Sequence, residues 1–65
     1  MDSNYAYHLL GILTVLERLD MNKDIATISK VMALQEKGLL TEMEMYTEVL
    51  EIAVKGLNGL VKEGN

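Results

Sequence analysis

The sequence contains no cysteine, no proline and only one histidine among its 65 residues. Without cysteine it cannot form a disulfide framework, and a single histidine cannot make a zinc site of the usual Cys/His kind. A domain of this size buries only about 60% of the surface that its unfolded chain exposes, so it needs another source of stabilisation. Of the usual sources, oligomerisation is the one that remains.

Phenylalanine and tryptophan are also absent, whereas leucine, methionine and alanine are frequent. This composition favours helices over strands. Hydrophobic residues make up 49% of the chain, which is too large a share for an intrinsically disordered segment. We therefore expect a single all-α domain that spans residues 1–65.

Basic residues are few, because six Lys and Arg stand against ten Asp and Glu, for a formal net charge of −4. Direct binding to nucleic acid needs clustered Lys and Arg that neutralise phosphates, so it is not expected. The longest uncharged run, residues 3–16, is shorter than the roughly 20 residues of a membrane-spanning helix. No basic segment of a signal peptide follows Met1, and these features together predict a cytoplasmic protein with no membrane partner.

The apolar spacing predicts three helices, at about residues 4–19, 23–37 and 42–62. In the first, apolar residues cover more than half of the circumference, so that helix is either central in a bundle or shared between two chains. The second has a narrower apolar stripe, and we expect it to be the most exposed of the three. The apolar arc of the third spans roughly 200°, which is wide enough to contact two neighbours.

A glycine and a capping box mark the corner between the second and third helices. Gly38 follows Lys37 where the second helix should end, because glycine adopts the left-handed conformation of a C-terminal cap without a Cβ penalty. Thr41 and Glu44 have the three-residue spacing of a capping box, in which each side chain bonds the backbone N–H of the other. Two helices joined by so few residues form a hairpin or a sharp corner.

The sequence offers few groups for catalysis or metal binding. His8 would need a nucleophile or an oriented carboxylate beside it, and its own helix supplies none at neighbouring spacing, so we interpret it as a surface or interface residue. Glu44, Glu48 and Glu51 share one helix face, but no glutamate has a histidine three residues later, as carboxylate-bridged metal sites in bundles require. We expect no catalytic residue, no metal and no cofactor.

A leucine-spaced helix, a Gly-aliphatic-aliphatic-Thr turn and an acidic stretch with an aromatic residue follow one another between residues 28 and 50. The residues are Val31, Leu34, Gly38, Leu39, Leu40, Thr41, Glu44 and Tyr46. This segment resembles the short C-terminal domain called SHOCT. It departs at Met43 and Met45, where that family usually shows a further acid and an aromatic, and Tyr46 is displaced by one position. The resemblance implies a helical hairpin that associates with other chains and has no enzymatic activity.

These features predict a small helical bundle that forms an intertwined or side-by-side homodimer. Its function would be that of a non-enzymatic interaction module, a small regulator or inhibitor that binds itself and a larger, unidentified protein. The predicted interface residues are Leu9, Ile12, Leu13, Leu16, Tyr46, Val49, Ala53 and Leu57. The alternative is an acidic nucleic-acid mimic, of the sort that phages and mobile elements encode, which blocks a DNA-binding protein through Glu44, Glu48 and Glu51.

Overall fold

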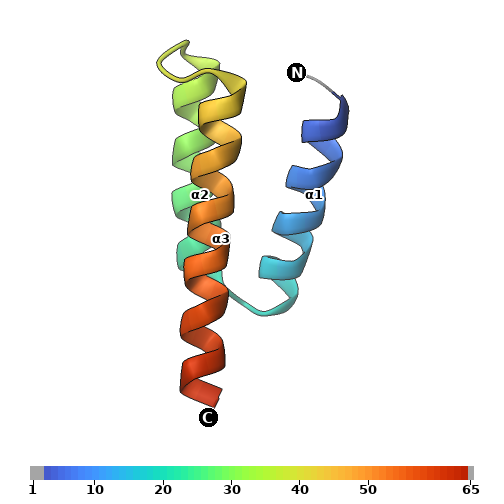
Figure 1. Cartoon of the computed structure of the whole chain (residues 1–65), viewed down its shortest axis with the longest axis vertical. Coiled ribbons are helices and arrows are strands. Elements are labelled where there is room, and N and C mark those ends of the chain that lie inside the picture. The colour runs from blue at the N-terminus through green and yellow to red at the C-terminus, as the bar shows by residue number, and fades with distance from the viewer. Residues whose placement is uncertain (1–2, 65) are drawn as a thin grey trace.

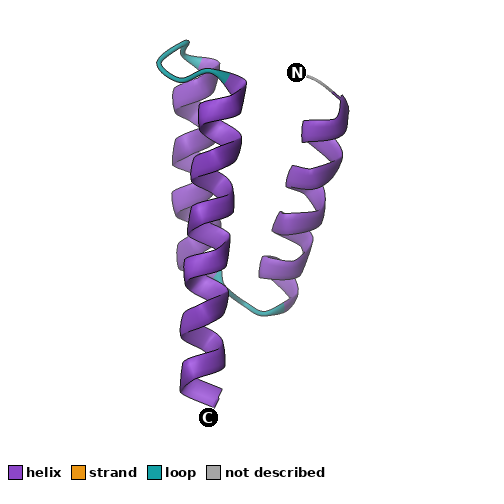
Figure 2. Cartoon of the chain, in the orientation of Figure 1, coloured by secondary structure: helices purple, strands orange, loops and turns teal. Residues whose placement is uncertain are grey.

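The computed structural model describes residues 3–64, and three helices account for most of them. These helices are α1 (Ser3–Arg18), α2 (Asn22–Glu36) and α3 (Glu42–Gly64). The predicted all-α class and the three-helix order are confirmed, and each predicted boundary lies within two residues of the observed one. The described part of the chain contains no strand (Figure 2).

α2 and α3 form an antiparallel hairpin, and α1 lies along one side of it (Figure 1). The contact between α2 and α3 is more extensive than either contact that α1 makes. As a result α1 has the largest share of exposed residues among the three helices. The expectation that α2 would be the most exposed helix is therefore wrong. A narrow apolar stripe is enough for α2 because it is covered by α3, whereas the wide arc of α1 exceeds what the hairpin can cover.

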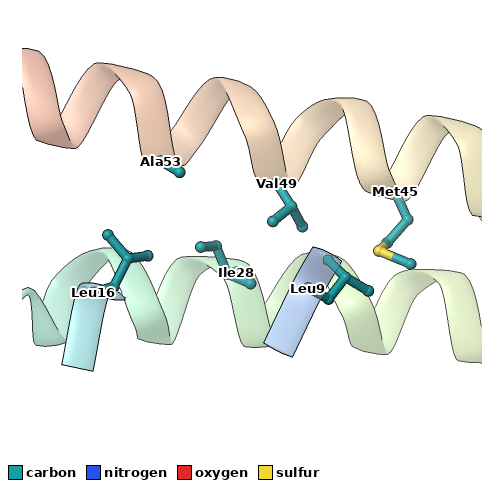
Figure 3. Close-up of a cluster of buried hydrophobic side chains, with 6 residues drawn as sticks. All are labelled: Leu9, Leu16, Ile28, Met45, Val49 and Ala53. Carbon is teal, nitrogen blue, oxygen red and sulfur yellow. The ribbon is translucent and has the colours of Figure 1, made fainter. Parts of the chain in front are cut away.

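The buried core lies where the three helices meet (Figure 3). Its residues are Leu9 and Leu16 from α1, Ile28 from α2, and Met45, Val49 and Ala53 from α3. The three α3 residues are spaced by four, which places them on one stripe of the helix. Figure 3 shows this stripe pointing toward α2. α3 thus supplies half of the buried residues, and both other helices pack against it.

The turn after α2 ends in the left-handed conformation that the sequence predicts. Gly38 has a φ of 81°. The backbone N–H of Leu39 donates to the carbonyl of Leu34, and that of Gly38 donates to the carbonyl of Gln35. This pair of bonds is the Schellman arrangement, which satisfies two of the last carbonyls of the helix. The predicted glycine cap is confirmed.

The turn after α1 has the same geometry without a glycine. Asp20 has a φ of 56°, the N–H of Met21 donates to the carbonyl of Leu16, and the N–H of Asp20 donates to the carbonyl of Glu17. Aspartate adopts the left-handed region more readily than most residues, although it still carries a Cβ. The sequence did not predict this cap because the usual signal for it is glycine.

We predict opposite effects of substitutions at the two left-handed positions. Gly38→Ala should lower the free energy of unfolding by about 1 kcal/mol, because a Cβ is unfavourable in this conformation. Asp20→Gly should raise it by about 0.5 kcal/mol, since relief of that penalty is offset in part by the greater freedom of glycine in the unfolded chain. Urea unfolding followed by circular dichroism, at one fixed protein concentration, measures both. Equal stability of Gly38→Ala and the parent would contradict the need for a left-handed turn.

Candidate interaction groove

An apolar cleft of about 400 Å³ lies between α1 and α3. α1 contributes His8, Gly11, Ile12, Val15 and Leu16 to its lining, and α3 contributes Tyr46, Leu50, Ala53 and Leu57. We refer to this cleft as the α1–α3 groove. Except for the polar groups of His8 and Tyr46, the side chains that line it are apolar.

The groove exists because α3 has two apolar stripes and its own chain fully covers only one. Met45 and Val49 belong to the stripe that faces α2, and both are fully buried. Tyr46 and Leu50 each follow one of these residues, so they point about 100° further around the helix. Tyr46 is half-buried and Leu50 is exposed. α1 is tilted relative to α3 (Figure 1) and covers this second stripe in part.

Apolar side chains at the edges of the groove remain in water. Val15 on α1 is 48% exposed, and Leu50 on α3 is 38% exposed. Beside Leu50, the outer face of α3 carries Val54, which is 55% exposed and borders a shallow hollow together with Glu51 and Lys55. The apolar surface therefore continues from the groove onto the outer face of α3 and meets charged side chains there.

An aromatic cluster ties the N-terminal half of α1 to the first turns of α3. Nδ1 of His8 lies at hydrogen-bond distance, 2.8 Å, from the hydroxyl of Tyr46, and the two rings meet edge to face. The ring centroids of Tyr5 and Tyr46 are 5.0 Å apart, and the Tyr5 hydroxyl donates to Sδ of Met43 over 3.8 Å. His8 is exposed at the edge of the groove. Its tyrosine partner lies on another helix, so sequence spacing could not reveal it.

The structure divides the predicted interface residues into two groups. Leu9, Leu16, Val49 and Ala53 are buried in the core of the single chain, while Ile12, Leu13, Tyr46 and Leu57 are half-buried against that core. The first group already contacts other helices of the same chain. Periodicity identified the apolar face of each helix correctly, but it carries no information about which helix covers that face.

Besides His8, three residues of the groove were not among those predictions. Val15 and Leu50 belong to the apolar arcs of their helices, but they lie at the edges of those arcs. Gly11 has no apolar side chain that periodicity could detect. The width of the apolar arc could have indicated these residues. An arc that is too wide for one neighbouring helix to cover leaves the residues at its edge exposed.

The three glutamates of the predicted acidic face are exposed on α3. One of them, Glu44, is part of the predicted capping box, which is confirmed. The backbone N–H of Thr41 donates to Oε1 of Glu44 over 3.0 Å, and the N–H of Glu44 donates to Oγ1 of Thr41 over 3.1 Å. Two hydrogen bonds from Thr41 lower the pKa of Glu44. The bond from the Thr41 backbone has the larger effect and that from its side chain the smaller, and both act by favouring the ionised carboxylate.

Residues 3–64 contain no group of three His, Cys, Asp or Glu side chains placed to hold a metal ion. None of the helices in this part of the chain has the length and apolar character to span a membrane.

No family model, curated protein or solved structure matches the chain. The SHOCT resemblance over residues 28–50 therefore stays a prediction from the sequence pattern. The structure has a capped helical hairpin in this segment, but the Gly38 turn and the Thr41 capping box produce such a corner on local grounds alone.

We predict that Thr41→Ala raises the pKa of Glu44 part of the way toward its ordinary value, since the alanine keeps the backbone N–H that lowers it most. The substitution should also destabilise the chain by about 1 kcal/mol through loss of the cap. Because the pKa of Glu44 is lower in the folded state, its contribution to stability is present above the unfolded-state pKa and is lost as pH falls through the folded-state value. An NMR titration of the Glu44 carboxyl carbon measures the change.

Thr41→Ser is the control for this experiment, because serine keeps the hydroxyl that accepts from the Glu44 N–H. It should leave the Glu44 titration close to that of the parent. Identical titration curves for Thr41→Ala and the parent would show that the side-chain bond does not act on the carboxylate.

Proposed function

We propose that this chain is a non-enzymatic protein–protein interaction module whose α1–α3 groove binds an apolar helix of another polypeptide. The observation that supports this proposal most directly is the groove itself, with exposed Val15 and Leu50 at its edges. Contiguous apolar surface of this kind commonly marks a binding site on a soluble protein. Amphipathic helices are the usual ligands of such grooves, because they bury one apolar face and keep the other in water.

The accessible surface of the chain supports the same proposal. It amounts to 4843 Å², whereas a folded monomer of 7.3 kDa should expose about 4,200 Å². The surplus of roughly 650 Å² approaches the roughly 800 Å² that each partner buries in a standard protein–protein interface. A bound helix in the groove would therefore bring the exposed area close to the ordinary value.

Two kinds of partner fit the groove under this proposal. The first is a second copy of the chain, because Leu50 and Val54 give α3 an apolar surface that its own chain leaves exposed. The second is a helix of a larger protein, which this chain would regulate or inhibit. Since both would use the same groove, self-association and binding of the larger protein would compete.

The acidic nucleic-acid mimic is supported by the exposure of Glu44, Glu48 and Glu51 on one face of α3. This row is short, because Glu44 is engaged with Thr41 and Lys55 follows one turn after Glu51. Replacement of Glu48 and Glu51 by glutamine should abolish binding to a DNA-binding protein if the mimic is correct. Binding that survives these changes but is lost when the groove is altered would favour the interaction module.

We predict that Val15→Glu converts a self-associated chain to a monomer in sedimentation equilibrium. A bound helix would bury the new carboxylate without a partner, at a cost of several kcal/mol. The single chain should keep its helical circular dichroism, because Val15 is already 48% exposed.

Leu39→Glu is the matched control, since Leu39 is 68% exposed in the connection between α2 and α3 and does not line the groove. This variant should self-associate as the parent does. A parent chain that remains monomeric at high concentration would contradict self-association, and a Val15→Glu variant that associates normally would contradict binding through the groove.

A further inference from the structure

We infer that the helix bound by this module is α3 of a second copy, and that the two α3 helices pair in parallel along one exposed face. This inference rests on the proposed function and adds to it the identity, the contact face and the direction of the partner helix. The face consists of six positions, which are Met43, Thr47, Leu50, Val54, Leu57 and Val61. We refer to them as the outer seam.

The outer seam has the spacing of a coiled-coil contact. Its members follow one another at alternating intervals of four and three residues, which keeps one stripe of a helix against a partner helix. At about 100° per residue they fall within an arc of about 80°. Five of the six side chains are exposed and Leu57 is half-buried, so the described part of the chain leaves most of this stripe uncovered.

The outer seam borders the α1–α3 groove. Leu50 and Leu57 belong both to the seam and to the lining of the groove. The apolar seam residues farthest from the groove are the most exposed, since Met43, Val54 and Val61 are 63%, 55% and 64% exposed. A helix packed on the seam would therefore cover these side chains and the open edge of the groove together.

The residue types along the seam favour an identical helix in the parallel direction. In a heptad written abcdefg, the a positions are β-branched and are Thr47, Val54 and Val61. The d positions are unbranched at Cβ and are Met43, Leu50 and Leu57. In parallel coiled coils, β-branched residues at a with leucine at d favour two strands. In such a pair each layer contains the same residue from both chains, so a second α3 matches every layer.

The flanks of the seam disfavour the antiparallel direction. Glu44 and Glu51 each follow a d position by one residue, so both lie on one flank. The other flank carries Tyr46, which is half-buried, and Ala53, which is buried. In an antiparallel pair equal flanks meet, and the glutamates of the two chains would face each other. In a parallel pair each acidic flank meets the other flank of the second copy instead.

The one polar side chain of the seam can be covered without loss of a hydrogen bond. Oγ1 of Thr47 donates to the carbonyl oxygen of Met43 over 2.8 Å. Burial of a hydroxyl is unfavourable when it leaves its partner in water and gains none in exchange. Because the Thr47 hydroxyl is already bonded within its own helix, a second chain can cover this position at little cost.

The exposed area of the chain suits a single partner of this kind. The surplus of roughly 650 Å² over an ordinary monomer is close to the roughly 800 Å² that each chain buries in a standard interface. In a symmetric dimer both chains use the same patch. One second copy therefore covers the outer seam of both chains at once.

The absence of cysteine allows a clean cross-linking test of the face and the direction. In a parallel pair each seam residue lies beside its own counterpart, so Met43→Cys and Val61→Cys should each form a disulfide-linked dimer under oxidising conditions. A disulfide needs two Cα atoms within about 7 Å of each other. Glu48→Cys is the control, because Glu48 is exposed on α3 but lies about 140° from the centre of the seam. It should form almost no linked dimer in the same time.

The other outcomes separate this inference from the proposed function. An antiparallel pair would link neither seam variant to itself but would link an equal mixture of the two, and this result overturns the parallel direction. No linkage in any variant or mixture, with a parent that self-associates, would overturn the outer seam and leave the interaction module standing. A monomeric parent would overturn the second copy as the partner. Seam linkage together with normal association of Val15→Glu would support the seam and contradict the groove.

A charge placed on the seam tests the pairing without cysteine. Val54→Glu should weaken self-association roughly a hundredfold or more, because the pair would bury two unpaired carboxylates. The single chain should keep its helical circular dichroism, since Val54 is exposed. Ser29→Glu is the matched control, because it adds the same charge at an exposed position of α2 outside the seam and the groove. It should associate as the parent does. Equal affinities of the two variants in sedimentation equilibrium would overturn the seam.

Discussion

The packing of α3 against α2 is the interaction on which the rest of the structure depends. Met45 and Val49 of α3 and Ile28 of α2 are fully buried in one core cluster, and truncation of such a side chain typically costs about 2–5 kcal/mol. This contact uses one stripe of α3 and fixes the direction in which the next stripe points. The position of α1 follows from it, because α1 packs on the side of α3 where Tyr46 is found.

The stability and the proposed function of this chain have the same physical origin. Three helices around a core of six buried residues leave several apolar side chains in water, because a small domain has too little interior for them. That surface weakens the isolated chain and at the same time supplies the area for a bound helix. The cluster around His8 and Tyr46 joins α1 to α3 at one part of the groove. The groove is therefore already formed in the single chain, before any partner binds.

Part of the candidate site could be predicted from the sequence. Ile12, Tyr46 and Leu57 were predicted at an interface and do line the groove, because they lie on wide apolar arcs. Leu9 and Val49 lie on the same arcs but are buried inside the single chain. Residues on one arc are equivalent in sequence, and they become different only when a neighbouring helix covers one side of it.

The sequence by itself determined the helices and the corner between α2 and α3, because these depend on interactions between residues at most five positions apart. Periodicity, the left-handed Gly38 and the capping box of Thr41 and Glu44 all act over this range. Only the tertiary structure decided that α1 would be the most exposed helix and that a groove would separate it from α3. Those features depend on the competition of α1 and α2 for the surface of α3, which is a competition between side chains far apart in the chain.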